Sequence, residues 1–256
     1  MTSAGGAGAG GRGASLTAAD AVRALEVFAN PGRSRDLGWF FKTGPGEYAE
    51  GDIFIGAKVP EVRKVAGEFA ALPLAEVEVL AHSPIHEERL LADVLLVNRY
   101  KKAKDDATRG ELFELWMRLG YEGCWNNWDL VDVAWLFGDW LIRYPNSALL
   151  DSLAGSSVLW ERRMGVLLTF AQIKIGKFDD CLRIAGLLHN DSHDLIHKAV
   201  GWMLREVGKV EDDALRAYLD ETAATMPRTM LRYAIEKQPE ALRQHYLGLA
   251  RAKNNR

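Results

Sequence analysis

The residues best suited to chemistry lie in the stretch Gly123–Trp140, which holds four of the eight tryptophans of the chain. Asn127 is a good N-cap, so the pattern predicts a helix that begins at Trp128. Asp129 then falls in the first turn, where free N–H groups and the helix dipole favour a carboxylate. Asp132 is the fifth helical residue and lies too deep to cap the helix. Its carboxylate is therefore expected either to pair with a basic side chain of another helix or to meet a cationic ligand.

Three later segments are similar to one another, because each carries a basic residue, then a small residue, then an apolar run. These segments are Trp160–Phe170, Leu195–Arg205 and Thr229–Lys237. Their basic residues Arg163, Lys198 and Arg232 are 35 and 34 residues apart. A two-helix unit that recurs at this length is typical of a HEAT-like solenoid, whose inner helices line a concave face. The three residues either form a basic stripe on that face or are ordinary solvated helix residues.

Such a stack brings together Trp128, Asp132, Arg163, Lys198 and Trp202. The cations suit DNA phosphates, and the aromatic side chains suit sugars or bases. A carboxylate in that groove needs another reason, because it repels DNA. Hydrolysis of an N-glycosidic bond supplies one, since its oxocarbenium-like transition state gathers positive charge on the sugar. The alternative is an Asp132–Arg163 ion pair that only joins two helices, and both interpretations can hold at once.

Helical spacing predicts an all-α chain of short antiparallel helix pairs, and no segment alternates as a strand does. Besides the Trp-rich helix, we expect helices at Ala18–Phe28, Arg33–Phe41, Pro60–Ala71, Leu74–Ala81, Ile85–Ala103, Ala107–Leu119, Leu149–Ala154, Val158–Ile175, Phe178–Leu188, His193–Val207, Asp212–Thr225, Pro227–Lys237 and Pro239–Lys253. The Gly/Ala-rich residues 1–14 are expected to be a disordered tail, and residues 15–256 a single domain. Core packing is expected for Trp116, Trp135, Trp140 and Trp160.

Composition limits the classes of function. The chain is 48% hydrophobic and 26% charged, which is ordinary for a soluble globular protein. Its formal net charge of −3 means that a nucleic-acid site must be a local basic patch. Two cysteines and scattered histidines predict neither a disulfide framework nor a zinc site. No stretch has the length of a transmembrane helix, and a cytoplasmic location is expected.

Four segments carry a family resemblance. They are WDLVD (Trp128–Asp132), WERR (Trp160–Arg163), HKAVGWMLRE (His197–Glu206) and the loop Gly46–Arg63. In these segments the chain resembles the AlkD family of DNA alkylation-repair glycosylases, and the resemblance extends over roughly residues 39–253. It implies a HEAT-like α-solenoid with a concave DNA-binding face.

Carried over residue by residue, the resemblance implies that Asp132 is the catalytic carboxylate and that Trp128, Arg163 and Trp202 contact DNA. The predicted DNA-binding set also includes Lys198, Arg162 and Lys58, the last at a place where some branches of the family carry glutamine. Asn127 stands where other members carry a further tryptophan.

The resemblance implies a monofunctional glycosylase for cationic alkylated purines such as 3-methyladenine and 7-methylguanine, which acts without flipping the base and without metal, cofactor or Schiff-base lysine. The expected partner is double-stranded DNA with alkylated bases, bound by a monomer that associates with the nucleoid. The alternative is a non-catalytic HEAT-like solenoid that binds DNA structures or a protein partner. A bulky residue inside the cleft, Tyr48 or Trp125, would produce this alternative. Asp132 distinguishes the two, because a pure DNA binder gains nothing from an acid in its groove.

Overall fold

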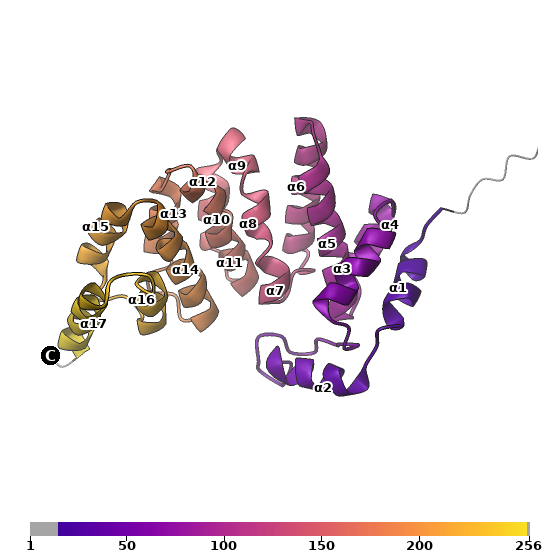
Figure 1. Cartoon of the computed structure of the whole chain (residues 1–256), viewed down its shortest axis with the longest axis horizontal. Helices are drawn as coiled ribbons and strands as arrows, with labels where there is room; N and C mark the ends of the chain where they lie inside the picture. Colours follow the sequence, from indigo (N-terminus) through magenta and orange to yellow (C-terminus); the bar gives the residue numbers. More distant parts are fainter. Residues whose placement is uncertain (1–14, 255–256) are drawn as a thin grey trace, which may run out of the picture.

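The computed structural model describes residues 15–254, and within them the chain is an all-helical solenoid (Figure 1). In this range no strand forms, and a single isolated bridge pairs Ile53 with Ile85. The helices are α1 (Ala18–Glu26), α2 (Pro31–Phe40), α3 (Val59–Glu68), α4 (Leu74–Ala81), α5 (His86–Lys102), α6 (Asp106–Tyr121), α7 (Trp128–Val131), α8 (Ala134–Phe137), α9 (Trp140–Arg143), α10 (Ser147–Ala154), α11 (Leu159–Leu167), α12 (Phe170–Lys174), α13 (Asp179–Leu187), α14 (Asp194–Val210), α15 (Asp212–Thr222), α16 (Arg228–Ala234) and α17 (Glu240–Asn254). The tail expected at residues 1–14 lies outside the described residues.

Local sequence signals set the start of several helices. At α1 the Thr17 side chain accepts from the Asp20 backbone N–H, and the Asp20 carboxylate accepts in return from the Thr17 backbone, which forms a capping box. Asn30 caps α2 directly before Pro31, whose fixed φ suits the first turn. Most of the expected helices are present, and α4 has the predicted bounds.

The Trp-rich stretch differs from the single helix that was expected. It divides into α7, α8 and α9, so Asp132 is the C-cap of α7 and does not lie inside a longer helix. Tight bonds of the 3₁₀ type interrupt the α pattern, as from the Leu136 N–H to the Val133 carbonyl at 2.8 Å. Trp135 on α8 is 38% exposed, so the prediction that it belongs to the core was wrong. In the same way the expected helix Val158–Ile175 divides into α11 and α12.

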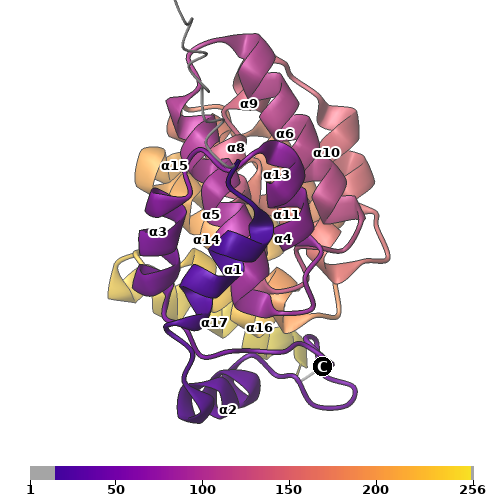
Figure 2. The same ribbon diagram turned by 90° about the vertical axis from the view of Figure 1, so that its right-hand side faces the viewer.

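One hydrophobic core runs through the array from Ala18 to Tyr246. In the C-terminal part of the array α14 packs closely on α16, because Gly201 has no side chain. A Cβ there would lie 2.5 Å from the Met230 carbonyl oxygen. Figures 1 and 2 both place α2 and α16 on the same side of the array. No described helix is both long and apolar enough to cross a membrane.

Candidate functional site

A cleft of about 470 Å³ is formed by the loop after α2 together with residues of α2, α7, α11, α14 and α16. Its lining residues are Phe40, Tyr48, Trp128, Asp132, Arg163, Leu195, Lys198, Trp202, Arg205 and Tyr233. The cleft thus brings together the five predicted residues Trp128, Asp132, Arg163, Lys198 and Trp202, which come from three separate regions of the sequence.

Asp132 and Arg163 form a two-pronged ion pair at this cleft. Arg163 Nε donates to Asp132 Oδ1 at 2.6 Å, and Nη2 donates to Oδ2 at 2.9 Å. The remaining nitrogen, Nη1, donates to the Leu195 carbonyl at 2.5 Å, so the guanidinium joins α7, α11 and α14. Arg163 is buried, with 6% of its side chain exposed, whereas 25% of the Asp132 side chain is exposed. The pair therefore presents the carboxylate to the cleft and keeps the cation behind it.

Burial raises the pKa of the Asp132 carboxyl above its usual range, while the hydrogen bonds and the positive charge of Arg163 act in the opposite direction. Asp132 is the only carboxylate among the described residues that line the cleft. The cleft therefore has one fixed anionic group in a largely desolvated place, where its electrostatic effect is stronger than in water.

The indole of Trp128 is held by aromatic packing and by the start of α7. It stacks on Phe41 at 5.2 Å between ring centroids, and Phe40 meets it edge-on at 6.1 Å. The fully buried Asn127 caps the helix through its side-chain oxygen, which accepts from the Trp128 N–H at 2.8 Å. The position of the Trp128 indole in the cleft is therefore fixed by this packing and by the cap.

His86 connects the start of α7 to the loop that precedes α3. Its Nδ1 lies 2.9 Å from Asp52 Oδ2, and its Nε2 lies 2.9 Å from Asp129 Oδ2. Burial alone would lower the pKa of His86, but hydrogen bonds and charge from Asp129 and Asp52 raise it to about 9. Arg89 also bonds to Asp52, so two cations and two carboxylates balance inside the protein. Asp129 thus has a buried partner in addition to its favourable place in the first turn.

The cations of the cleft have acidic neighbours at its margin. Lys198 Nζ lies 2.8 Å from Asp194 Oδ2, one turn earlier on α14. Arg205 pairs with Glu236. The Trp202 side chain is held in place by its indole N–H, which donates to Glu206 Oε1 at 3.2 Å. Lys198 and Arg205 therefore lie in the cleft but must exchange or share these acidic partners when they bind an anion.

Two residues of the predicted DNA-binding set do not line the cleft. Arg162 donates to Asp191 Oδ2 at 2.7 Å and to the Ser156 carbonyl at 3.0 Å, so it ties α11 to the loop before α14. Lys58 is exposed directly before α3 and lines a neighbouring apolar cavity of about 370 Å³. DNA contact by Arg162 and Lys58 stays a prediction, and the contacts of Arg162 account for it as a structural residue.

The expected basic stripe needs one change of register. Arg163 and Lys198 line the cleft, but the third lining residue is Tyr233, and Arg232 is exposed outside the lining. Tyr233 lies 35 residues after Lys198, so the spacing from Arg163 is regular when Tyr233 takes the third place. The stripe is therefore two cations followed by an aromatic side chain.

Sequence reasoning missed Phe40, Leu195, Arg205 and Tyr233 as cleft residues. Arg205 had a usable signal, because Lys198, Trp202 and Arg205 recur at i, i+4 and i+7 and so share a helix face. No local sequence signal marks Phe40, since its approach to Trp128 depends on the folding of the loop between α2 and α3.

Of the two bulky candidates for the cleft, the structure places only Tyr48 there. Its ring meets Trp160 at 5.9 Å and His193 at 6.4 Å. Trp125 is 1% exposed and donates its indole N–H to the Trp116 carbonyl in the core. Trp125 is thereby excluded as an obstacle in the cleft.

Comparison with known proteins concerns the family and the fold of the chain. The family model described as DNA alkylation repair enzyme matches residues 21–238. Among solved structures, the chain is similar to a predicted DNA alkylation repair enzyme from Enterococcus faecalis, with a TM-score of 0.65 and 18% identity, over 83% of this chain and 97% of the other. No curated protein sequence matches. At 18% identity the structural similarity shows a shared fold only. The family match covers most of the chain.

Proposed function

The chain belongs to the DNA alkylation repair enzyme family, and from that premise we propose that it is a monofunctional DNA glycosylase. Its substrates would be cationic alkylated purines, of the 3-methyladenine and 7-methylguanine type, in duplex DNA. The observation that carries the proposal is the carboxylate of Asp132, held by Arg163 in a cleft whose other polar side chains are mainly basic. A groove that only bound phosphates would be weakened by such an acid.

The reaction suits a single carboxylate. Alkylation at N3 or N7 places a positive charge on the purine, so the base leaves with the electron pair of the C1′–N bond and becomes neutral without a proton from the enzyme. Positive charge then builds on the sugar, as in other oxocarbenium-like transition states. Asp132 stabilises that charge and orients a water, whose oxygen adds to C1′ and whose proton is released. The products are the free alkylated base and an abasic sugar.

The remaining cleft residues suit a DNA backbone. Lys198 and Arg205 supply positive charge for phosphates, while Trp128 and Trp202 offer flat apolar faces for deoxyribose. The described lining contains no amide and no aliphatic hydroxyl side chain. Enzymes that flip a base enclose it in a pocket and read its hydrogen-bonding edge there. The charged and aromatic side chains of this lining also suit the DNA backbone, and excision without base flipping is part of the proposal.

Tyr48 is the observation that favours a second candidate, a solenoid that binds DNA without cleaving it. Its ring occupies the cleft wall between Trp160 and His193. If that ring blocks access to Asp132, Tyr48→Ala should raise base release. If Tyr48 is part of the binding wall, the same change should lower it.

The test is base release from duplex DNA treated with a methylating agent, followed by separation of the free bases. Release of 7-methylguanine or 3-methyladenine by the purified protein is the expected result. Duplex binding without any base release would contradict the glycosylase proposal and favour the non-catalytic alternative.

A further inference from the structure

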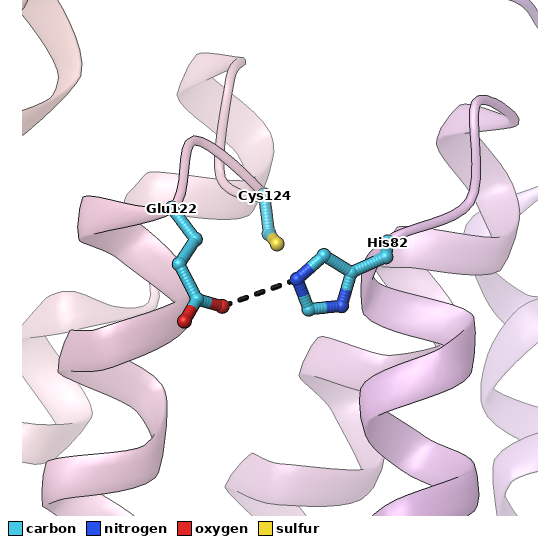
Figure 3. A group of neighbouring side chains, drawn as sticks. All are labelled: His82, Glu122 and Cys124. Atoms are coloured by element: carbon cyan, nitrogen blue, oxygen red, sulfur yellow. Dashed lines mark hydrogen bonds and ion pairs between the residues drawn. The ribbon is translucent and has the colours of Figure 1, made fainter.

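A group of potential metal ligands lies where α4 and α6 end, among residues that do not line the cleft (Figure 3). His82 is the C-cap of α4, Glu122 is the C-cap of α6, and Cys124 follows two residues later. One ligand atom from each of the three lies within 4.8 Å of the others. Imidazole nitrogen, carboxylate oxygen and thiolate sulfur are the three ligand types that Zn²⁺ takes in proteins.

The hydrogen bonds of His82 leave a lone pair that needs a cation. Its Nδ1 lies 2.8 Å from the Glu78 carbonyl oxygen, which can only accept, so Nδ1 carries the hydrogen. In the neutral ring Nε2 then has a lone pair, and this atom lies 3.1 Å from Glu122 Oε2, which is also an acceptor. Two acceptors face each other stably only when a proton or a metal ion lies between them.

The surroundings hold the other two ligands in place. Gly123 adopts a left-handed φ of 82°, which ends α6 and lets the Cys124 N–H bond back to the Leu119 carbonyl at 3.0 Å. Arg118 Nη1 donates to Glu122 Oε1 at 3.1 Å and to Oε2 at 3.4 Å, and Oε2 is the oxygen that lies 3.1 Å from His82 Nε2. Metal ligands are commonly oriented by such outer partners, a carbonyl behind the histidine and a cation behind the carboxylate.

Two of the three ligands are accessible to ions from solvent. His82 and Glu122 have 49% and 38% of their side chains exposed, whereas Cys124 is 5% exposed. The buried Cys124 side chain is a free thiol, which loses its proton when it becomes a metal ligand. A bound divalent ion would displace that proton and form a metal–thiolate bond. The thiolate and the Glu122 carboxylate together would balance its two positive charges.

We propose that His82, Glu122 and Cys124 form a site for Zn²⁺ or a similar divalent transition-metal ion, with water in the fourth position, that joins the ends of α4 and α6. The site is separate from the cleft and does not depend on the proposed glycosylase activity. Sequence spacing did not indicate it, because His82 lies about forty residues before its partners and is brought to them only by the packing of α4 beside α6.

The test is titration of the tag-free, chelator-treated chain with Co²⁺, a spectroscopic substitute for zinc. We expect a sulfur-to-metal charge-transfer band that saturates at one ion per chain and is displaced by Zn²⁺. Cys124→Ser should remove the band, and His82→Asn should weaken binding by more than the roughly 10–100-fold that loss of an outer hydrogen-bond partner costs. Cys181→Ser is the matched control, because Cys181 is also a buried free cysteine but has no place in this group.

Thermal unfolding gives a second measurement on the same variants. Zn²⁺ should raise the melting temperature of the unmodified chain and of Cys181→Ser, but not that of Cys124→Ser, because an ion that binds only the folded state stabilises it. A folded, unmodified chain that shows no charge-transfer band, or a band that survives Cys124→Ser, would overturn the proposal. Base release does not enter either measurement.

Discussion

Arg163 engages both carboxylate oxygens of Asp132, so the negative charge of the cleft cannot rotate away from the space that it faces. The guanidinium is itself anchored to the Leu195 carbonyl, and its side chain is nearly inaccessible to solvent. The ion pair and the proposed catalytic role of Asp132 are therefore compatible, because the pair fixes the carboxylate while each oxygen keeps a lone pair for another partner.

Asp132→Asn should abolish most release of 7-methylguanine and leave duplex binding intact or tighter. Loss of a fixed charge at the developing oxocarbenium ion costs on the order of 3–4 kcal/mol, or about 10²–10³ in rate. Single-turnover base release at saturating protein measures this change. Asp36→Asn on α2 is the control, since Asp36 is exposed and does not line the cleft. Full activity of Asp132→Asn would contradict the mechanism.

The same mechanism predicts that neutral bases such as uracil are not substrates. Uracil is a neutral and poorer leaving group, and the cleft offers no evident acid to protonate it, so the unmodified protein should not release uracil. Efficient uracil release under the conditions that release 7-methylguanine would show that the enzyme does more than stabilise the sugar.

The salt dependence of DNA binding should separate the cations by their accessibility. The slope of log affinity against log salt is negative, and each phosphate contact that is lost makes it less steep by roughly 0.9. Lys198→Ala should therefore flatten the slope by about one unit. Arg163→Ala should leave the slope unchanged and reduce base release, because the buried guanidinium faces Asp132 and fixes its carboxylate. A flatter slope in Arg163→Ala would instead place Arg163 on a phosphate.

Parts of this arrangement followed from the sequence, and the reason differs from residue to residue. Asp132, Lys198 and Trp202 could be placed because helical spacing and the repeat put each on an inner face. The break between α8 and α9 could not, since it lies at Gly138, which approaches the Leu168 carbonyl so closely that a Cβ would lie 2.3 Å away.

Contacts between distant segments were also beyond the sequence. His86 meets Asp52 and Asp129, which lie 34 and 43 residues away, and nothing in the local pattern marks those partners. The basic pattern predicts Arg232 as the third residue of the stripe. In the structure the residue that lines the cleft is Tyr233, one position later on α16. A pattern of charge alone cannot detect an aromatic member of such a series.

Phe40→Ala should weaken binding to duplex DNA without unfolding the protein. Phe40 is 54% exposed on α2 and meets Trp128 at the edge of the cleft, so it is available to pack against sugar or base. Loss of one aromatic contact of this kind costs about 1–3 kcal/mol. Binding titrations at fixed salt measure the effect, and Val79→Ala is the control because Val79 is 60% exposed on α4. Equal affinities of the two variants would exclude α2 from the interface.

The free energy of unfolding should fall as pH rises from about 6.5 to about 9, because of His86. Its pKa is raised in the folded state by Asp129 and Asp52, so folding is favoured while the imidazole is protonated. This contribution is fully present below the unfolded pKa and is lost as pH passes through the folded one. For a shift of this size it is on the order of 3 kcal/mol.

Urea unfolding at pH 6 and at pH 9.5 tests this expectation in the unmodified chain and in His86→Gln. Glutamine can bond to one carboxylate but carries no charge, so the variant should be less stable at pH 6 and should lose most of the difference between the two pH values. His189→Gln is the matched control, because His189 is half-buried and its imidazole bonds to the Thr225 hydroxyl at 2.9 Å, with no carboxylate as a hydrogen-bond partner. If His86→Gln kept the full pH dependence, the charge that joins the loop to α7 would have to reside on another group.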